Sequence, residues 1–97
     1  MIVQLRFFGP FTQYTGHAPL AIDVPEDARL QDVVEYIADQ WGGVFPPQLW
    51  DQQNRRFQTG VLLLLDQHPI NQEQESELHR PLTDGMTLMV LYTVMGG

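Results

Sequence analysis

Few residues in this chain could carry out covalent chemistry. The sequence contains one serine, Ser76, and three histidines, His17, His68 and His79, all in stretches that we predict to be turns or loops. Their spacing produces no Ser-His-Asp set and no closely spaced histidine pair of the kind that holds a metal ion. No glycine-rich phosphate loop follows a predicted strand. We therefore expect no catalytic residue, no metal site and no bound cofactor in this chain.

Cysteine is absent, which removes several further kinds of site. Without cysteine the chain can form no disulfide, no iron–sulfur cluster, no thiolate zinc site and no cysteine nucleophile. The same absence fits a reducing cytoplasm, which is the location we expect. The opening residues 1–6 read directly as a strand rather than as a signal peptide. The longest apolar run, Val61–Leu65, is far too short to cross a bilayer, so we expect no membrane association.

The last two residues, Gly96 and Gly97, have a composition that suits chemistry better than structure. A glycine pair has no side chains to pack and is costly to order, which makes it poor structural material. The same lack of Cβ atoms would let a C-terminal carboxylate thread into the narrow active site of a partner enzyme. The alternative is a frayed end or a remnant of cloning, and these two residues alone do not decide between the two.

The net charge of −7 arises from twelve acidic residues and five arginines, and lysine is absent. A basic surface that binds nucleic acid is therefore not expected. The acidic field would favour encounters with a partner that has a basic face, although solubility alone explains the charge more simply. Because lysine is missing, only the N-terminal amine could accept another copy of the chain, so the protein cannot polymerise on itself through lysine.

Periodicity predicts two strands at the N-terminus. Val3, Leu5 and Phe7 alternate with polar residues, which indicates a half-buried strand, and Phe8 stands on its polar side. A second alternating run covers residues 20–24. With their short link, these two runs predict a hairpin.

Residues 29–41 change to a helical period. One apolar stripe repeats at helical spacing: Leu30, Val33, Val34, Ile37, Ala38 and Trp41. Gly42-Gly43 is predicted to end the helix. Its start is ambiguous, because Asp27 has no capping-box partner three residues further on. A helix with one apolar stripe must be covered by another element, and the predicted strands supply a sheet for it.

Residues 44–60 show no regular pattern. Pro46-Pro47 argues against a helix or strand there, and the apolar residues stand isolated: Leu49, Trp50 and Phe57. Arg55-Arg56 is the only basic pair in the chain. It could face a carboxylate or phosphate on a partner, but a solvated loop is the interpretation that we favour.

The remaining residues predict two more strands. Val61–Leu65 is a continuous apolar run, which predicts a strand buried on both faces in the middle of a sheet. Residues 86–94 are predicted to form the last strand, which runs straight into Gly96-Gly97. Between these two strands we expect, in order, a turn at residues 66–69, an exposed acidic loop at 70–78 and a second turn at 81–85 with its Asp-Gly signal.

The predicted order is β-β-α-β-β. This order gives an α+β fold with one main helix packed on a mixed sheet, in a single domain over residues 1–97 that ends in a flexible Gly-Gly tail. The first and last strands are candidates for parallel neighbours at the centre of the sheet, a pairing that the sequence alone leaves open.

Alternation along the last strand predicts an exposed apolar patch. One face carries Leu88, Val90 and Tyr92, and the other carries Met89, Leu91 and Thr93. Met89 and Leu91, together with Phe8 from the first strand, would form a patch beside the tail, and such patches often mark interfaces. The alternative is that a loop or the Leu49-Trp50 segment covers them.

These stretches, taken in order, resemble the MoaD/ThiS family of ubiquitin-like β-grasp sulfur carriers, which includes the small subunit of molybdopterin synthase and the thiamine-pathway sulfur carrier. The resemblance covers nearly the whole length: the strand ending Phe7-Phe8, residues 20–28, the helix to Trp41, Gly60–Leu65, Pro81–Gly85 and Gly96-Gly97. The Pro-Leu-x-Asp-Gly pattern of Pro81–Gly85, followed by a last strand and Gly-Gly, is the most specific part.

Three departures from the family pattern concern the pathway rather than the fold. Asp66-Gln67 occupies the turn where the family often has Asn-Gly, and Met86 follows Asp-Gly where an acidic residue is common. Residues 92–95 contain no proline, whereas the molybdopterin branch often has prolines just before the tail.

The resemblance implies a carrier rather than an enzyme. A partner enzyme would use ATP to adenylate the carboxylate of Gly97, and a sulfur donor would then displace AMP. The resulting thiocarboxylate would deliver its sulfur inside a second enzyme. Recognition of the tail is expected at Gly96 and Met95, and contacts with partners are expected at Phe8, Met89, Leu91 and Thr93.

The implied partners are an ATP-dependent adenylating enzyme and the sulfur-accepting large subunit of a synthase. Molybdopterin is the product that we expect, because the long segment before Gly60 resembles that branch more than the compact thiamine carrier. Two other functions stay open. One is a ubiquitin-related modifier that is conjugated to proteins through Gly97, and the other is a noncovalent β-grasp binding module.

Overall fold

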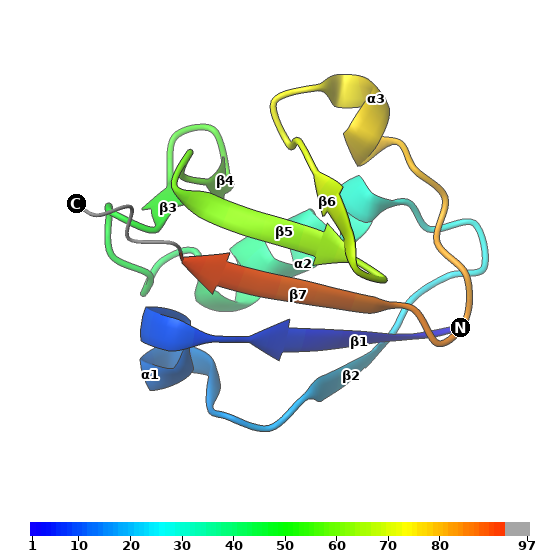
Figure 1. Cartoon of the computed structure of the whole chain (residues 1–97), viewed down its shortest axis with the longest axis horizontal. Coiled ribbons are helices and arrows are strands. Elements are labelled where there is room, and N and C mark those ends of the chain that lie inside the picture. Colours follow the sequence, from blue (N-terminus) through cyan, green and yellow to red (C-terminus); the bar gives the residue numbers. More distant parts are fainter. Residues whose placement is uncertain (93–97) are drawn as a thin grey trace.

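The computed structural model describes residues 1–92, and residues 93–97 lie outside the described part. The elements in chain order are β1 (Ile2–Phe7), η1 (Gly9–Phe11), α1 (Thr12–Thr15), β2 (Leu20–Asp23), α2 (Leu30–Trp41), β3 (Trp50–Asp51), β4 (Arg56–Phe57), β5 (Val61–Leu65), β6 (His68–Ile70), α3 (Glu75–Leu78) and β7 (Thr87–Tyr92). One mixed sheet has the strand order β2-β1-β7-β5-β6, and β3 pairs with β4 in a separate two-stranded sheet (Figure 1).

The centre of the main sheet is the parallel pair formed by the first and last strands. Leu5 of β1 lies opposite Leu88 of β7, and Phe7 lies opposite Val90. The neighbouring pairs β1–β2, β5–β7 and β5–β6 are antiparallel. The predicted parallel pairing is therefore confirmed, and so is the α+β fold with one main helix on a mixed sheet.

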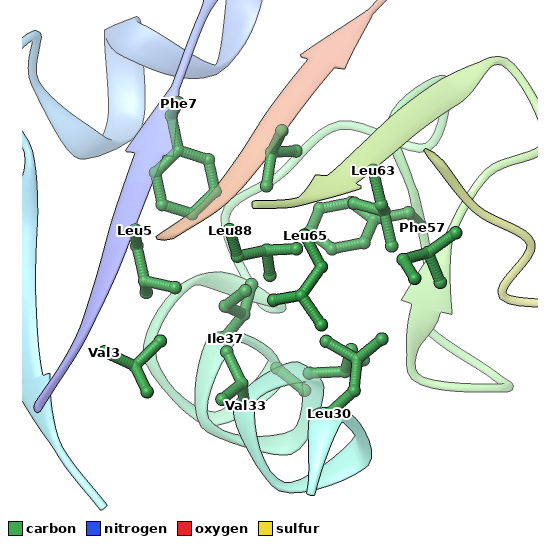
Figure 2. Packing of buried hydrophobic residues seen from close by; sticks show 14 of the residues in the cluster. Val3, Leu5, Phe7, Leu30, Val33, Ile37, Phe57, Leu63, Leu65 and Leu88 are labelled. Carbon is green, nitrogen blue, oxygen red and sulfur yellow. The ribbon is translucent and has the colours of Figure 1, made fainter. Parts of the chain in front are cut away.

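Helix α2 buries its apolar stripe against one face of this sheet. Val33 and Ile37 are fully buried, as are Leu5 and Leu88 on the strands. Figure 2 shows these side chains of α2, β1 and β7 pointing toward one another, together with Leu63 and Leu65 of β5. Each aliphatic side chain buried in this way contributes about 1.5–3 kcal/mol to folding. The layer between helix and sheet is thus the core that fixes the position of every strand.

The start of α2 is set by a residue that the sequence prediction did not select. The backbone N–H of Arg29 donates a hydrogen bond to the carboxylate of Asp32 at 2.8 Å, which is half of a capping box. The helix therefore begins after Arg29, and Asp27 is not its cap. The guanidinium of Arg29 also donates to the carbonyl oxygen of His79 at 2.7 Å and so ties the helix start to the segment that leads to β7.

The prediction of irregular structure holds for most of residues 44–60, including Pro46-Pro47, but it missed two short strands, β3 and β4. Strands β3 and β4 pair there, with Trp50 opposite Phe57. The two rings meet edge to face with centroids 4.9 Å apart, and both residues belong to the main core together with Phe45 and Leu49. These residues look isolated in the sequence because their contacts are tertiary rather than periodic.

The two arginines of the β3–β4 hairpin have structural partners. Arg55 contacts carboxylates of α2, with Nη2 at 2.6 Å from Asp39 and 3.0 Å from Glu35. Hydrogen bonds to Asp39 and Glu35 raise the pKa of the Arg55 guanidinium. Arg56 donates to the backbone carbonyl of Gln72 at 3.1 Å. Arg55 is exposed in the turn between β3 and β4, as the interpretation of a solvated loop expected, whereas Arg56 belongs to β4 and is partly buried. Both side chains also have partners within the protein, which that interpretation did not include.

Strand β5 differs from its prediction in burial. Val61, Leu63 and Leu65 are buried, whereas Leu62 and Leu64 on the other face are only partly buried. The continuous apolar run indicated burial on both faces, and that prediction is wrong. The strand lies between β7 and β6 rather than at the sheet centre.

The stretch after β5 is more ordered than the sequence indicated. The turn is limited to Asp66 and Gln67, because His68–Ile70 form the edge strand β6. The predicted exposed loop at residues 70–78 contains the short helix α3 and buries Ile70, Gln72 and Leu78. These three side chains fold the acidic segment back onto the core.

Candidate functional site

The candidate functional site is the face of the main sheet opposite α2. The helix lies across one face only (Figure 1), and side chains alternate between the two faces along each strand. On β7, Leu88 and Val90 are fully buried, whereas Met89 and Leu91 between them are partly exposed. The last strand thus presents apolar side chains away from the helix, as the alternation predicted.

Strand pairing collects further side chains around these two. Met89 lies opposite Leu64 of β5 on one side and opposite Arg6 of β1 on the other. Leu91 lies opposite Leu62. We call the apolar residues Leu62, Leu64, Met89 and Leu91, with Phe8 at the end of β1, the docking face. All five are partly buried, so each retains apolar surface that a partner could cover.

Phe8 joins this face because its backbone is still extended, with φ −130° and ψ 163°, and strand alternation turns its side chain to the face opposite that of buried Phe7. Its backbone N–H still donates to the carbonyl of Val90 at 3.0 Å, which keeps it beside β7. The guanidinium of Arg6 lies 5.4 Å from the centroid of the Phe8 ring, within the range of a cation–π contact. The docking face therefore has an aromatic residue and a cation at its β1 side.

Sequence reasoning missed Leu62 and Leu64. Both belong to the continuous run Val61–Leu65, which looked buried throughout. Their outward direction follows from the strand period of two combined with pairing to β7, and the pairing is a tertiary fact. Phe8 was identified because it stands on the polar side of its strand. Met89 and Leu91 were identified because alternation places them on the face opposite Leu88 and Val90.

The proposed cover for this face is placed elsewhere. Leu49 and Trp50 are buried in the main core, and Trp50 packs on Phe57. Phe57 in turn meets Phe11 with centroids 5.7 Å apart. The Leu49-Trp50 segment therefore lies on the helix side of the sheet, and the alternative that it shields Met89 and Leu91 is wrong.

The residues expected to carry the chemistry lie beyond the described part. Strand β7 ends at Tyr92. Thr93, Met95, Gly96 and Gly97, which the sequence analysis selected for partner contact, tail recognition and adenylation, are outside the described residues.

Within residues 1–92 no group of three or more His, Asp or Glu side chains converges as a metal site. Among these residues no helix has the length and hydrophobicity needed to span a bilayer.

A polar cleft of about 480 Å³ lies beside the β3–β4 hairpin, and Asp51, Gln58 and Gln72 are among the residues that line it. Hydrogen bonds from Asn54, the side-chain amide first, hold the pKa of Asp51 below its usual value.

Comparison with known proteins supports the fold. No family model and no curated relative matches the sequence. Solved structures do match over the full length. Small archaeal modifier SAMP1 from Haloferax volcanii has a TM-score of 0.75 at 15% identity, with 100% of each chain covered. Urm1 from Trypanosoma brucei has a TM-score of 0.72 at 21% identity, with 99% of this chain and 95% of that chain covered.

A third match comes from a complex. The structure of subunits 1 and 2 of the molybdopterin-converting factor from Helicobacter pylori matches with a TM-score of 0.62 at 24% identity, and 100% of each chain is covered. Because all three identities are low, these similarities establish a shared ubiquitin-like β-grasp fold.

Proposed function

We propose that this protein is a sulfur carrier of the MoaD/ThiS type whose C-terminal residue, Gly97, is adenylated and then converted to a thiocarboxylate. One observation supports this most: β7, the strand that leads toward Gly96-Gly97, is a central strand of the sheet and carries the docking face. A partner that covers Met89 and Leu91 would therefore hold the strand from which the last residues continue. This couples recognition of the body to delivery of the tail.

The chemistry explains why the carrier needs a partner for activation. A carboxylate is a poor electrophile because its charge is shared by two oxygens. Attack of the Gly97 carboxylate on the α-phosphate of ATP gives an acyl adenylate and releases pyrophosphate. Hydrosulfide then adds to the acyl carbon, the C–O bond to AMP breaks, and loss of a proton leaves the thiocarboxylate. That sulfur is an anionic nucleophile at neutral pH.

The catalytic groups for these steps belong to the partners in this proposal. The first partner is an ATP-dependent adenylating enzyme, and the second is the sulfur-accepting large subunit of a synthase. The structural match to a complex of two molybdopterin-converting factor subunits supports a partner of the second kind. Molybdopterin is accordingly the product that we propose, with the reaction taking place in the cytoplasm. The carrier body would supply recognition, and no cofactor would be bound to it.

A protein modifier is the second candidate function. The matched structures named as SAMP1 and as small archaeal modifier protein 1 favour it, because a modifier uses the same activated glycine to form isopeptide bonds. The two functions differ in their products. Conjugates of this chain on lysines of other proteins in a cell extract would favour the modifier, whereas a free thiocarboxylate consumed by a synthase would favour the carrier.

Deletion of Gly97 tests the role of the tail. We expect the shortened chain to bind the synthase large subunit through the docking face but to transfer no sulfur, because the carboxylate can no longer reach the acceptor. The measurement is product formation in a reconstituted synthase reaction, with circular dichroism and thermal unfolding as controls for the fold. A shortened chain with full function would instead identify a noncovalent binding module.

A further inference from the structure

Within residues 1–92, Arg6 differs from the other arginines in having no hydrogen-bond acceptor on the protein. Arg29 and Arg56 donate to backbone carbonyls, Arg55 pairs with two carboxylates, and Arg80 pairs with Glu77: these contacts account for four of the five arginines. Among the described residues the guanidinium of Arg6 has only its contact with the Phe8 ring. Its hydrogen-bond donors therefore have no acceptor within residues 1–92.

The position of Arg6 makes this unusual. Arg6 is exposed on β1, directly opposite Met89 of the docking face. It lines a shallow hollow of about 260 Å³ together with Met89 and Asp66, among others. Asp66 is already used, because its carboxylate accepts the backbone N–H of Thr87 at 2.9 Å. The hollow thus combines the apolar side chain of Met89 with the guanidinium of Arg6, and the salt bridges among the described residues include none between Arg6 and Asp66.

Burial of this face creates a requirement on the partner. A partner that covers Met89 and Phe8 removes water from the Arg6 guanidinium, and an unpaired charge removed from water costs several kcal/mol. The guanidinium cannot lose its proton to escape this cost. The covering surface must therefore bring an acceptor, and a carboxylate matches the planar fork of guanidinium donors with two parallel hydrogen bonds.

We propose that Arg6 determines partner specificity by pairing with an Asp or Glu side chain presented by the protein that covers the docking face. This inference rests on the proposed function, because it requires that face to be buried in a complex. The chain carries a net charge of −7, so a partner with a generally basic face is favoured at long range. A single acid within that face would then fix the register, because a misplaced complex would leave both charges buried and unpaired.

The test compares three variants in binding to the adenylating enzyme and to the synthase large subunit. Arg6→Met removes the charged guanidinium and leaves an uncharged, flexible side chain close in length to the aliphatic part of arginine. Arg6→Lys keeps the charge but loses the planar fork. Arg80→Met is the matched control, because it changes the net charge equally at an exposed site on the end of α3, away from the docking face.

We expect the dissociation constant measured by calorimetry to rise about tenfold or more for Arg6→Met with at least one partner. Arg6→Lys should give a smaller rise, and Arg80→Met should leave affinity within about twofold at constant ionic strength. A further variant, Arg6→Glu, reverses the charge and should bind more weakly than the wild-type chain. A partner in which the paired acid is replaced by Arg should bind Arg6→Glu better than it binds the wild-type chain.

The binding results distinguish a failure of the Arg6 pairing from a failure of the docking face or of the proposed function. Unchanged affinity of Arg6→Met, together with a clear loss for Leu91→Ala, would overturn the carboxylate pairing and leave the docking face intact. Unchanged affinity of both variants, with normal loading of Gly97, would remove the docking face as well. A wild-type chain that binds neither partner would overturn the proposed function and this inference with it.

Discussion

At the residue scale, the end of helix α2 was predicted correctly, but Gly42 is needed there for a different reason from the one expected. The helix ends at Trp41, as Gly42-Gly43 predicted, but Gly42 keeps right-handed backbone angles with φ −56°. Glycine is needed at position 42 because there is no room for a side chain. A Cβ at Gly42 would lie 3.1 Å from Nε1 of Trp50 and 2.5 Å from the carbonyl oxygen of Ala38. The β3–β4 hairpin therefore packs where only glycine fits.

Gly42→Ala should lower the free energy of unfolding by about 1–3 kcal/mol, because the added methyl overpacks the contact between helix end and hairpin. Gly43→Ala is the control, since a Cβ there meets no atom within 4 Å. Chemical denaturation monitored by tryptophan fluorescence gives both values. Equal effects of the two substitutions would contradict this account of the close approach.

The turn between β5 and β6 shows a second residue-scale constraint. Asp66 and Gln67 both have positive φ, at 47° and 71°. Two such residues are typical of the tight hairpin turn that Asn-Gly prefers, and a side chain like that of Gln67 is strained there. The departure from Asn-Gly noted in the sequence thus changes the local energy but preserves the turn.

Gln67→Gly should stabilise the protein by about 1 kcal/mol, because glycine adopts positive φ without the steric cost. Gln53→Gly serves as the control in another turn, since Gln53 has no positive φ and gains nothing from glycine. Thermal unfolding compares the two. A destabilised Gln67→Gly variant, or an equal gain at Gln53, would show that the turn is not strained.

At the scale of elements, the docking face is a property of two paired strands rather than of one. Leu91 and Met89 of β7 are extended by Leu62 and Leu64 of β5 through their register. All four side chains are partly buried, so truncating one removes little of the core. Their loss should therefore affect association more than folding.

Leu91→Ala and Phe8→Ala should each raise the dissociation constant for a partner by about fivefold or more, while leaving the unfolding midpoint nearly unchanged. Val44→Ala is a matched control, because Val44 is 57% exposed and lies just beyond the end of α2, away from the docking face. Calorimetry with the same two partners provides the measurement. Affinity that is equal for all three variants would remove the docking face from the account.

Elements with a regular period could be predicted, and those built by distant contacts could not. β1 and α2 were predictable because alternation and helical spacing are visible in Val3–Phe7 and Leu30–Trp41. Strands β3 and β4 have two residues each and depend on the packing of Trp50 and Phe57, which no local pattern encodes. β6 was hidden because it contains Pro69, which an edge strand tolerates.

At the scale of the whole molecule, composition limits function more sharply than any local motif. From the acidic charge and the absence of lysine in this sequence we expect no basic nucleic-acid surface and no self-conjugation through lysine side chains, and both stay predictions. The sequence order also anticipated the parallel centre of the sheet, although only the structure pairs β1 with β7. The candidate site was partly predictable: three residues of the docking face were identified, and two required the register of β5.

The central claim is that Gly97 carries sulfur, and intact mass spectrometry tests it most directly. The full chain is incubated with ATP, a sulfide source and a candidate adenylating enzyme, beside a chain that lacks Gly97. We predict that the full chain alone gains the mass difference of one oxygen replaced by one sulfur, and only when ATP is present. No gain with several adenylating enzymes that bind the docking face would contradict the account and favour a noncovalent binding module.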